Sequence, residues 1–202
     1  LDINNSKMII CHIGSGASIS AVVNGKSVDT SMGMTPLEGL VMGTRSGDID
    51  PAIVEFICNK EGKSVSEVLT MLNKKSGVLG ISGLSNDYRD LLEGEENGNQ
   101  DAHNALDVLV YRIIKYIGAY HVAIGGADAI ALTAGAGENN FVVRGRIVEG
   151  LSALGIKLNE AANTVRGEEL LLSTPDSAIP VWVVPTNEEL RIARETAAVV
   201  EK

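Results

Sequence analysis

The chain has 202 residues, of which 45% are hydrophobic, and a formal net charge of −9. This length suits one large domain or two small ones with a substantial core, and the composition is that of an ordinary globular protein. The acidic balance argues against a general nucleic-acid or anionic-membrane surface, which would need a basic patch, but a few local donors could still bind a small anion.

The first elements read as a β-meander. Residues 7–13 are almost continuously apolar, as in a buried strand, and residues 17–23 alternate as a second strand. Gly14-Ser15-Gly16 turns the chain between them. Asn24-Gly25 is a strong hairpin signal, so residues 26–30 should return as a third strand.

A long loop from Thr30 to Pro51 follows, rich in glycine and carrying Arg45. Glycines let a main chain approach a ligand closely, and loops of this kind are often functional. Arg45 offers a planar fork of donors suited to carboxylate or phosphate oxygens. The alternative is that Arg45 only stabilises its own loop through Asp48 or Asp50.

The middle of the chain is predicted to be helical. Asp50 caps a first helix over 52–60, and a capping box at Ser64–Glu67 opens a second that runs through Lys75, with Gly77 as its stop. Residues 93–101 read as a polar connection. A long helix over 102–124 then presents a wide apolar face.

The last third alternates strands and helices, which predicts an α/β layered domain. A buried strand over 128–133 leads through Ala134-Gly135-Ala136-Gly137 into a helix from about Glu138 to Leu151. Such a helix start supplies N–H donors for an anion, although a tight β–α turn explains the glycines equally well. The remaining predictions are a helix over 159–164, a strand over 178–184 and a terminal helix over 187–201, capped by Thr186 or Asn187.

The turn at Gly14-Ser15-Gly16 excludes two common nucleotide motifs. It lies between two strands, whereas a P-loop or a Rossmann fingerprint needs a following helix. A tight strand–glycine–strand turn can still aim N–H groups at a phosphate.

Five segments in order resemble acetate kinases, of the acetate and sugar kinase/Hsp70/actin superfamily. They are HIGSGAS at 12–18, the Arg45 loop, SGLSNDYRDL at 82–91, TAGAGEN at 133–139 and PTNEELRIARET at 185–196. The resemblance implies a ribonuclease H-like (actin-like ATPase) domain, with a mixed sheet and flanking helices. Because these kinases are about twice this length, residues 1–202 would be their C-terminal nucleotide-binding domain, and the helix at 187–202 would pack on the N-terminal domain.

The resemblance also implies the site residues. Arg45 would stabilise the phosphoryl group in transfer, and Glu188 would lie near a catalytic Mg²⁺, although acidic residues are common in any first helical turn. The implied ATP contacts are His12, Gly14, Ser15, Gly16, Asp87, Tyr88, Arg89, Gly135, Ala136, Gly137, Glu138 and Asn139. Ser15 replaces the usual asparagine and Ala136 the usual isoleucine. His12 could instead be a core histidine, and residues 86–89 a solvated helix start.

The implied reaction is reversible transfer of the γ-phosphoryl group of ATP to acetate, giving acetyl phosphate and ADP. Further family residues (an asparagine and serine loop, a second arginine, an aspartate and a second histidine) lie upstream of Leu1, so we expect this chain to be inactive alone. Propionate kinase, or a non-catalytic nucleotide-binding or dimerisation module, is the alternative.

The resemblance further implies a homodimer. The apolar face of residues 102–124 is compatible with one, as it is with core burial. Cys11 and Cys58 lie in apolar segments without metal-ligand spacing, no apolar run reaches membrane-spanning length, and no secretory signal is visible. These features favour a cytoplasmic protein.

Overall fold

The computed structural model describes residues 1–200, apart from the side chain of Glu188. A six-stranded mixed sheet has the order β3-β2-β1-β4-β6-β5. β1 pairs antiparallel with β2, and β2 with β3, which confirms the predicted meander. β1 also pairs parallel with β4, and β4 with β6, so the other side of the sheet contains parallel strands. The strands are β1 Lys7–Ile13, β2 Ala17–Val23, β3 Lys26–Thr30, β4 Ala129–Thr133, β5 Leu170–Leu171 and β6 Val181–Val183.

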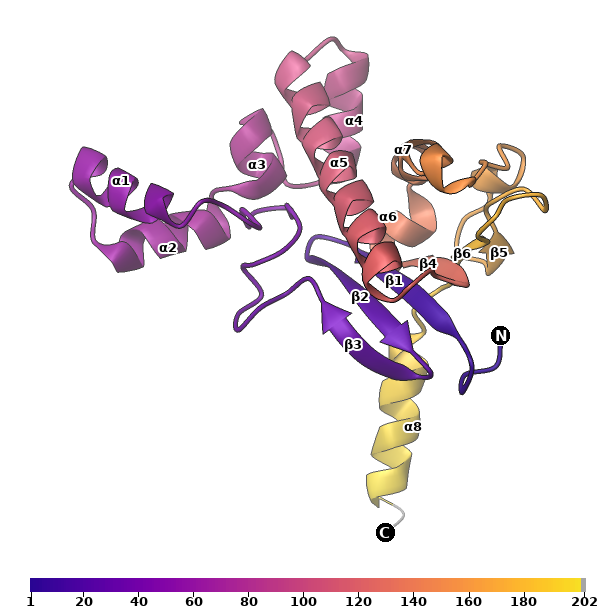
Figure 1. Ribbon diagram of the computed structural model, residues 1–202. Helices are drawn as coiled ribbons and strands as arrows, with labels where there is room; N and C mark the ends of the chain where they lie inside the picture. The colour runs from indigo at the N-terminus through magenta and orange to yellow at the C-terminus, as the bar shows by residue number, and fades with distance from the viewer. Residues whose placement is uncertain (201–202) are drawn as a thin grey trace.

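Helices surround this sheet (Figure 1). The long helix α5 lies across one face, contacts β1 and β2, and packs against α3, α4 and α7. The α-helices are α1 Ala52–Glu61, α2 Val65–Lys74, α3 Gly77–Ser82, α4 Tyr88–Glu96, α5 Gln100–Ala123, α6 Ala134–Asn139, α7 Phe141–Gly150 and α8 Glu188–Val200. No helix in the described part of the chain is both long and apolar enough to cross a membrane.

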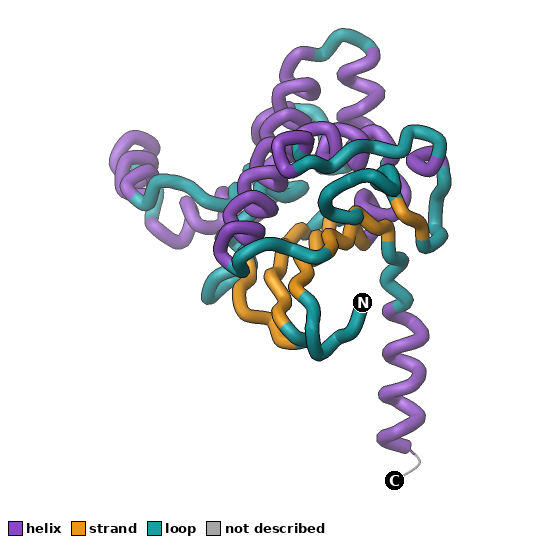
Figure 2. Tube along the Cα trace, turned by 45° about the vertical axis from the view of Figure 1, so that its right-hand side comes forward, coloured by secondary structure: helices purple, strands orange, loops and turns teal. Residues whose placement is uncertain are grey.

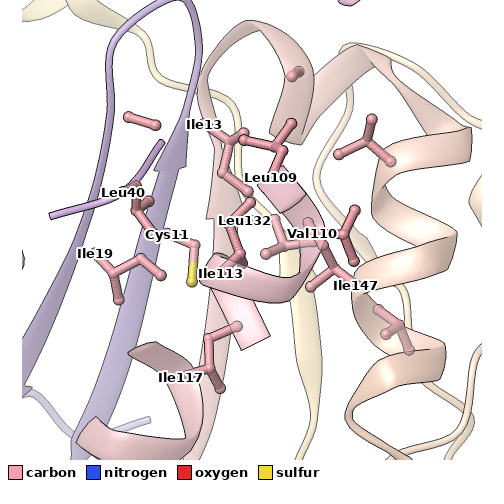
Figure 3. Close-up of a cluster of buried hydrophobic side chains, with 14 of the residues drawn as sticks. Cys11, Ile13, Ile19, Leu40, Leu109, Val110, Ile113, Ile117, Leu132 and Ile147 are labelled. Carbon is pink, nitrogen blue, oxygen red and sulfur yellow. The ribbon is translucent and has the colours of Figure 1, made fainter. Parts of the chain in front are cut away.

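The core lies between the sheet and α5 (Figure 3). Leu109, Ile113 and Ile117 of α5 meet Cys11 and Leu132 of the sheet there, all completely buried. Burial therefore accounts for the apolar face predicted over 102–124, and it also raises the pKa of the Cys11 thiol above its usual value.

The alternation of β1 places its other residues on the opposite face of the sheet. Ile9, Cys11 and Ile13 are buried, whereas Ile10 and His12 are only half-buried. Because side chains alternate across a strand, His12 points away from the α5 core. The interpretation of His12 as a core histidine is therefore wrong.

Two helical segments project from the body of the molecule. α1 and α2 form an arm beside the sheet, and α8 extends from the sheet on its own (Figures 1 and 2). None of the described residues of α1 is buried, and α2 buries only Val68 and Leu72. The capping box of α2 is present as predicted, and the Asp50 carboxylate accepts from Ala52 N at the start of α1.

Two element boundaries in the helical region differ from the prediction. Gly77 does not stop a helix but begins α3, at φ +63°, where a Cβ would lie 2.2 Å from the Met42 carbonyl oxygen. The polar connection predicted over 93–101 is shortened because α4 continues through Glu96, with Leu91 buried against the core. Helix formers such as glutamate extend an amphipathic helix even when one face is solvated.

The elements in the last third of the chain also differ in detail from the prediction. The helical turn of α6 begins at Ala134, at φ +65°, so the glycine segment is itself the first turn and does not precede it. A single 3₁₀ turn at Ala162–Thr164 replaces the helix predicted over 159–164. The strand predicted over 178–184 is confirmed over Val181–Val183, and Asn187 accepts from Leu190 N as the cap of α8.

Candidate functional site

The turn between β1 and β2 is held by contacts from two distant segments. The Tyr88 hydroxyl donates to the Gly14 carbonyl at 2.9 Å, and Gly43 N donates to the Ser15 carbonyl at 3.0 Å. Within the turn, Gly14 N donates to Gly16 O at 3.1 Å. The start of α4 and the arginine-bearing loop therefore both buttress this glycine turn.

A first cleft of about 930 Å³ opens beside the turn. Its walls come from the end of β1, the start of α6 and the segment leading into α8. Five of the sequence-predicted site residues line it, namely His12, Gly14, Ser15, Gly16 and Gly135. A glycine turn and the start of α6 thus border one space, and a glycine turn is an element that can bind an anion.

A second cleft of about 730 Å³ adjoins the first and shares Gly14, Ser15 and Gly135 with it. It lies between α4 and the start of α7. The other sequence-predicted residues that line it are Asp87, Tyr88, Arg89, Ala136 and Asn139. Segments separated by more than a hundred residues in the chain therefore meet around two connected spaces.

Arg45 lies at the edge of the first cleft without lining it. A Cβ on Gly16 would lie 3.5 Å from Arg45 Nη1, so the guanidinium packs against the glycine turn. Nη1 donates to the Pro36 carbonyl at 3.2 Å. Asp48 instead accepts from Arg112 and Tyr116, each at 2.8 Å.

The Asp50 carboxylate accepts from Ala52 N, 3.0 Å away. Within the described part of the chain neither Asp48 nor Asp50 bonds Arg45, so the interpretation of Arg45 as a partner of these aspartates is wrong.

Asp87 and Arg89 form the exposed rim of the second cleft. Asp87 caps α4, accepting from Arg89 N at 2.9 Å and from Arg89 Nη2 at 2.6 Å. Hydrogen bonds from Arg89 lower the pKa of Asp87 to about 2, so its carboxylate is ionised at neutral pH. Tyr88 is buried beneath them, and burial raises its pKa to about 12. Its hydroxyl therefore stays protonated as the donor to Gly14.

Glu138 and Gly137 support the site from behind. Glu138 Oε1 accepts from Ala134 N at 2.9 Å and from both N and Oγ1 of Thr186 at 2.8 Å, which ties α6 to the segment before α8. Burial alone would raise the pKa of Glu138, but the bonds from Thr186 and Ala134 outweigh it and lower that pKa. Gly137 is buried, and neither residue lines a cleft.

The sequence prediction missed several cleft residues. Phe141 and Arg166 line the second cleft, and Asn187 and Glu189 line the first. An arginine in a polar segment, such as Arg166, carries no periodicity or spacing that could have indicated its position.

The predicted metal residue, Glu188, has its side chain outside the described part of the structure. The neighbouring Glu189 lines the first cleft, so the acidic start of α8 lies at that cleft. Across the described residues no group of three or more His, Cys, Asp and Glu side chains is placed to hold a metal. One carboxylate with substrate phosphates is enough for Mg²⁺, so the donor set fits a metal bound together with a nucleotide.

Comparison with known proteins matches this architecture to one family. The model of the acetokinase family matches residues 1–194. The chain is 56% identical over 200 residues to an acetate kinase from Lachnoclostridium phytofermentans, and 60% identical over 196 residues to one from Dictyoglomus thermophilum. It covers 51% and 49% of those proteins and 99% and 97% of itself, so it spans about half the length of the curated relatives it matches.

Comparison with solved structures leads to the same family. A crystal structure of Porphyromonas gingivalis acetate kinase superimposes with a TM-score of 0.94 at 45% identity, over 99% of this chain and 50% of that one. A propionate kinase from Francisella tularensis gives 0.88 at 42% identity, over 95% and 49%. The predicted ribonuclease H-like, actin-like ATPase fold is therefore confirmed.

Proposed function

This chain belongs to the acetokinase family, and we propose that it forms the nucleotide-binding half of an acetate kinase site. The observation that carries the proposal is the pair of connected clefts sharing Gly14, Ser15 and Gly135. One nucleotide laid across both would place its phosphates at the glycine turn and its nucleoside between α4 and α7.

The reaction we propose is reversible transfer of the ATP γ-phosphoryl group to acetate, giving acetyl phosphate and ADP. Such transfer depends on positioning and on neutralising charge more than on covalent chemistry by the protein. Arg45, packed against Gly16 at the edge of the phosphate cleft, would donate to the equatorial oxygens of the group in transfer. Mg²⁺ bound with the nucleotide near Glu188 would supply further charge neutralisation.

The proposal leaves part of the site outside this chain. Relatives are about twice as long, and we propose that catalysis requires the half of them that the chain does not match. α8 projects from the sheet with Leu190 and Ile192 exposed, which supports the view that it packs on that other half.

A propionate substrate is the second candidate, because a propionate kinase superimposes well. The higher identity to the curated acetate kinases, 56% and 60%, favours acetate. A non-catalytic nucleotide-binding or dimerisation module is the remaining alternative. Titration with Mg-ADP tests whether the chain binds a nucleotide. The cytoplasm is the proposed compartment, supported by two free cysteines, Cys11 and Cys58.

A second copy of the chain is the partner we propose for the α1–α2 arm. Ile53, Phe56, Val65 and Leu69 are exposed on it, with Phe56 62% exposed. The arm lies on the opposite side of the molecule from the N-terminus (Figure 1). The apolar face of α5 is buried in the core, so the arm is the better candidate for a homodimer contact.

The test of the proposed function is calorimetric titration with Mg-ADP. A Cβ on Gly135 would meet nothing within 4 Å and Gly135 lines both clefts, so the side chain of Gly135→Val should take up space that the nucleotide needs. We expect the parent to bind with an affinity between high μM and mM, about 4–6 kcal/mol, and Gly135→Val to abolish measurable binding.

The matched control is Gly118→Val, a glycine in α5 that is equally open and lies away from both clefts. It should bind as the parent does. Failure of the parent to bind, or equal binding by Gly135→Val, would contradict the proposal.

A further inference from the structure

Arg166 and Phe141 lie against each other in the wall of the second cleft. The guanidinium of Arg166 lies 5.4 Å from the centroid of the Phe141 ring, and both side chains line the cleft. Phe141 is 42% exposed, which is unusual for a ring at the start of a packed helix. Among the described residues no carboxylate lies within ion-pair distance of Arg166, and its side chain lines the cleft.

A buried arginine holds this pair in place. Arg144 is completely buried, and Nη1 donates to the Glu138 carbonyl at 2.6 Å. Nη2 donates to the carbonyls of Asn163 and Val165, at 2.7 and 2.9 Å, and Nε donates to Asn163 Oδ1 at 3.1 Å.

Asn163 in turn donates to the Phe141 carbonyl at 2.8 Å. The side chains of Arg144 and Asn163 together therefore join the end of α6, the start of α7 and the loop that carries Arg166.

This arrangement is costly for the fold. Every acceptor of Arg144 is a neutral oxygen, and a buried charge without an opposite charge is destabilising. Burial, and secondly the charge of Arg166, lowers the pKa of Arg144. A hydrophobic residue would fill the same space without that cost, so the position of the loop that carries Arg166 is what Arg144 specifies.

We infer that Arg166 and Phe141 are the wall on which the nucleobase stacks, and that Arg144 is the residue that positions this wall. The inference rests on the proposed function and adds specificity residues to it. A planar base stacks on aromatic rings and guanidinium planes alike.

The charged groups that line this cleft balance one another. Asp87 and Glu96 are matched by Arg89 and Arg166, and Asp87 pairs with Arg89, so the cleft has no net charge and suits a neutral purine and ribose. The proposed phosphate position is the glycine turn, where the two clefts meet at Gly14 and Ser15.

The experiment titrates Mg-ADP into the 202-residue chain and its variants. Arg166→Ala should weaken binding by about 3- to 30-fold, the range that a cation–π or stacking contact supports. Arg166→Lys should recover little, because an ammonium has no plane to stack. Arg191→Ala is the matched control, since Arg191 is exposed on α8, pairs with Glu195 and lines neither cleft.

Salt separates stacking from attraction to phosphate. At about 1 M salt the Debye length is only about 3 Å. If Arg166 acts by long-range attraction to the phosphates, the loss of affinity in Arg166→Ala should vanish at this salt concentration. If Arg166 acts by stacking on the base, the variant should lose the same factor in affinity at both salt concentrations. If the loss in Arg166→Ala disappears at high salt, or never appears although the parent binds, the inference is overturned while the proposed function stands. If the parent itself does not bind, the proposed function fails and the inference falls with it.

Arg144→Met tests the positioning role. A folded Arg144→Met protein should lose the same factor in affinity as Arg166→Ala, and the double variant should lose no more, because both act through one wall. Additive losses would overturn the role of Arg144. Should Arg144→Met not fold, Asn163→Ala replaces it with the same expected non-additivity, because it removes the bond to the Phe141 carbonyl and the acceptor of Arg144 Nε but leaves the backbone carbonyls that Arg144 Nη2 binds.

Discussion

The hydroxyl of Tyr88 donates a hydrogen bond to the carbonyl oxygen of Gly14, 2.9 Å away, across 74 residues of sequence. It fixes the glycine turn of the proposed phosphate cleft to the first residue of α4. The site is therefore a junction of segments that lie far apart in the chain.

Tyr88→Phe keeps the buried ring and removes only the bond to Gly14. We expect a loss of about 0.5–1.5 kcal/mol in the free energy of unfolding, measured by urea denaturation. Weaker Mg-ADP binding should accompany it, because the turn loses a restraint. Tyr111→Phe is the control, since Tyr111 is exposed on α5 and its hydroxyl makes no hydrogen bond to any described residue. Equal stability of both variants would contradict the role of Tyr88.

Glu138→Gln should destabilise the protein at neutral pH. The folded-state pKa of Glu138 is lowered, so the carboxylate contributes stability above the ordinary glutamate pKa of about 4.3, and this contribution is lost as pH falls through the folded-state pKa. Hydrogen bonds to a charged acceptor are worth about 1.5–3 kcal/mol. Melting temperatures of parent and variant, measured from pH 7 down to acid, should therefore converge; a gap that persists at low pH would disprove the charge-based account.

Arg45→Ala should leave the fold intact and remove phosphoryl transfer in a protein of the relatives' full length. An arginine acting on such a transition state is worth about 10³–10⁵ in rate, and Arg45→Lys should restore little, because one ammonium lacks the bidentate fork. The KM for ATP should change far less than kcat. Arg112→Ala is the contrast: it removes the ion pair with Asp48, which keeps its bond from Tyr116, so the melting temperature of this variant should fall. A large stability loss in Arg45→Ala with less than about tenfold change in kcat would refute the assignment.

The chain on its own should not turn over acetate and ATP. The clefts hold the proposed nucleotide site, but Arg45 is the one residue in the proposal that meets the transferring group, and relatives contain a further half. A coupled assay of ADP release on the pure 202-residue protein checks this. Acetate-dependent release that co-purifies with the chain would show that no other half is required.

Phe56→Asp should convert a dimer into monomers if the α1–α2 arm is the homodimer contact. The substitution places a charge in the middle of the exposed apolar surface, where it would be desolvated on association. Light scattering on parent and variant measures the mass. The control is Glu55→Gln, a change on the same helix that removes a charge instead; a monomeric parent, or a dimeric Phe56→Asp, would disprove the contact.

The sequence by itself determined the local elements and the family. The alternation of residues 7–30 with Asn24-Gly25 specified three strands, because strand and hairpin signals are local. The capping box at Ser64 specified the start of α2 for the same reason. Motifs around the glycine turns and Arg45 were recognisable because each is a short contiguous string.

Only the tertiary structure decided which of these strings meet, and what each residue does there. The partner of Tyr88 is Gly14 and the partner of Glu138 is Thr186, pairs that no spacing in the sequence predicts. Gly77 could be identified as the start of α3 only from its close approach to Met42, and Arg166 as a cleft residue only from the loop that Arg144 holds. Long-range contacts come from packing a whole chain, so hydrogen-bond partners and cleft walls are properties of the fold and not of any segment.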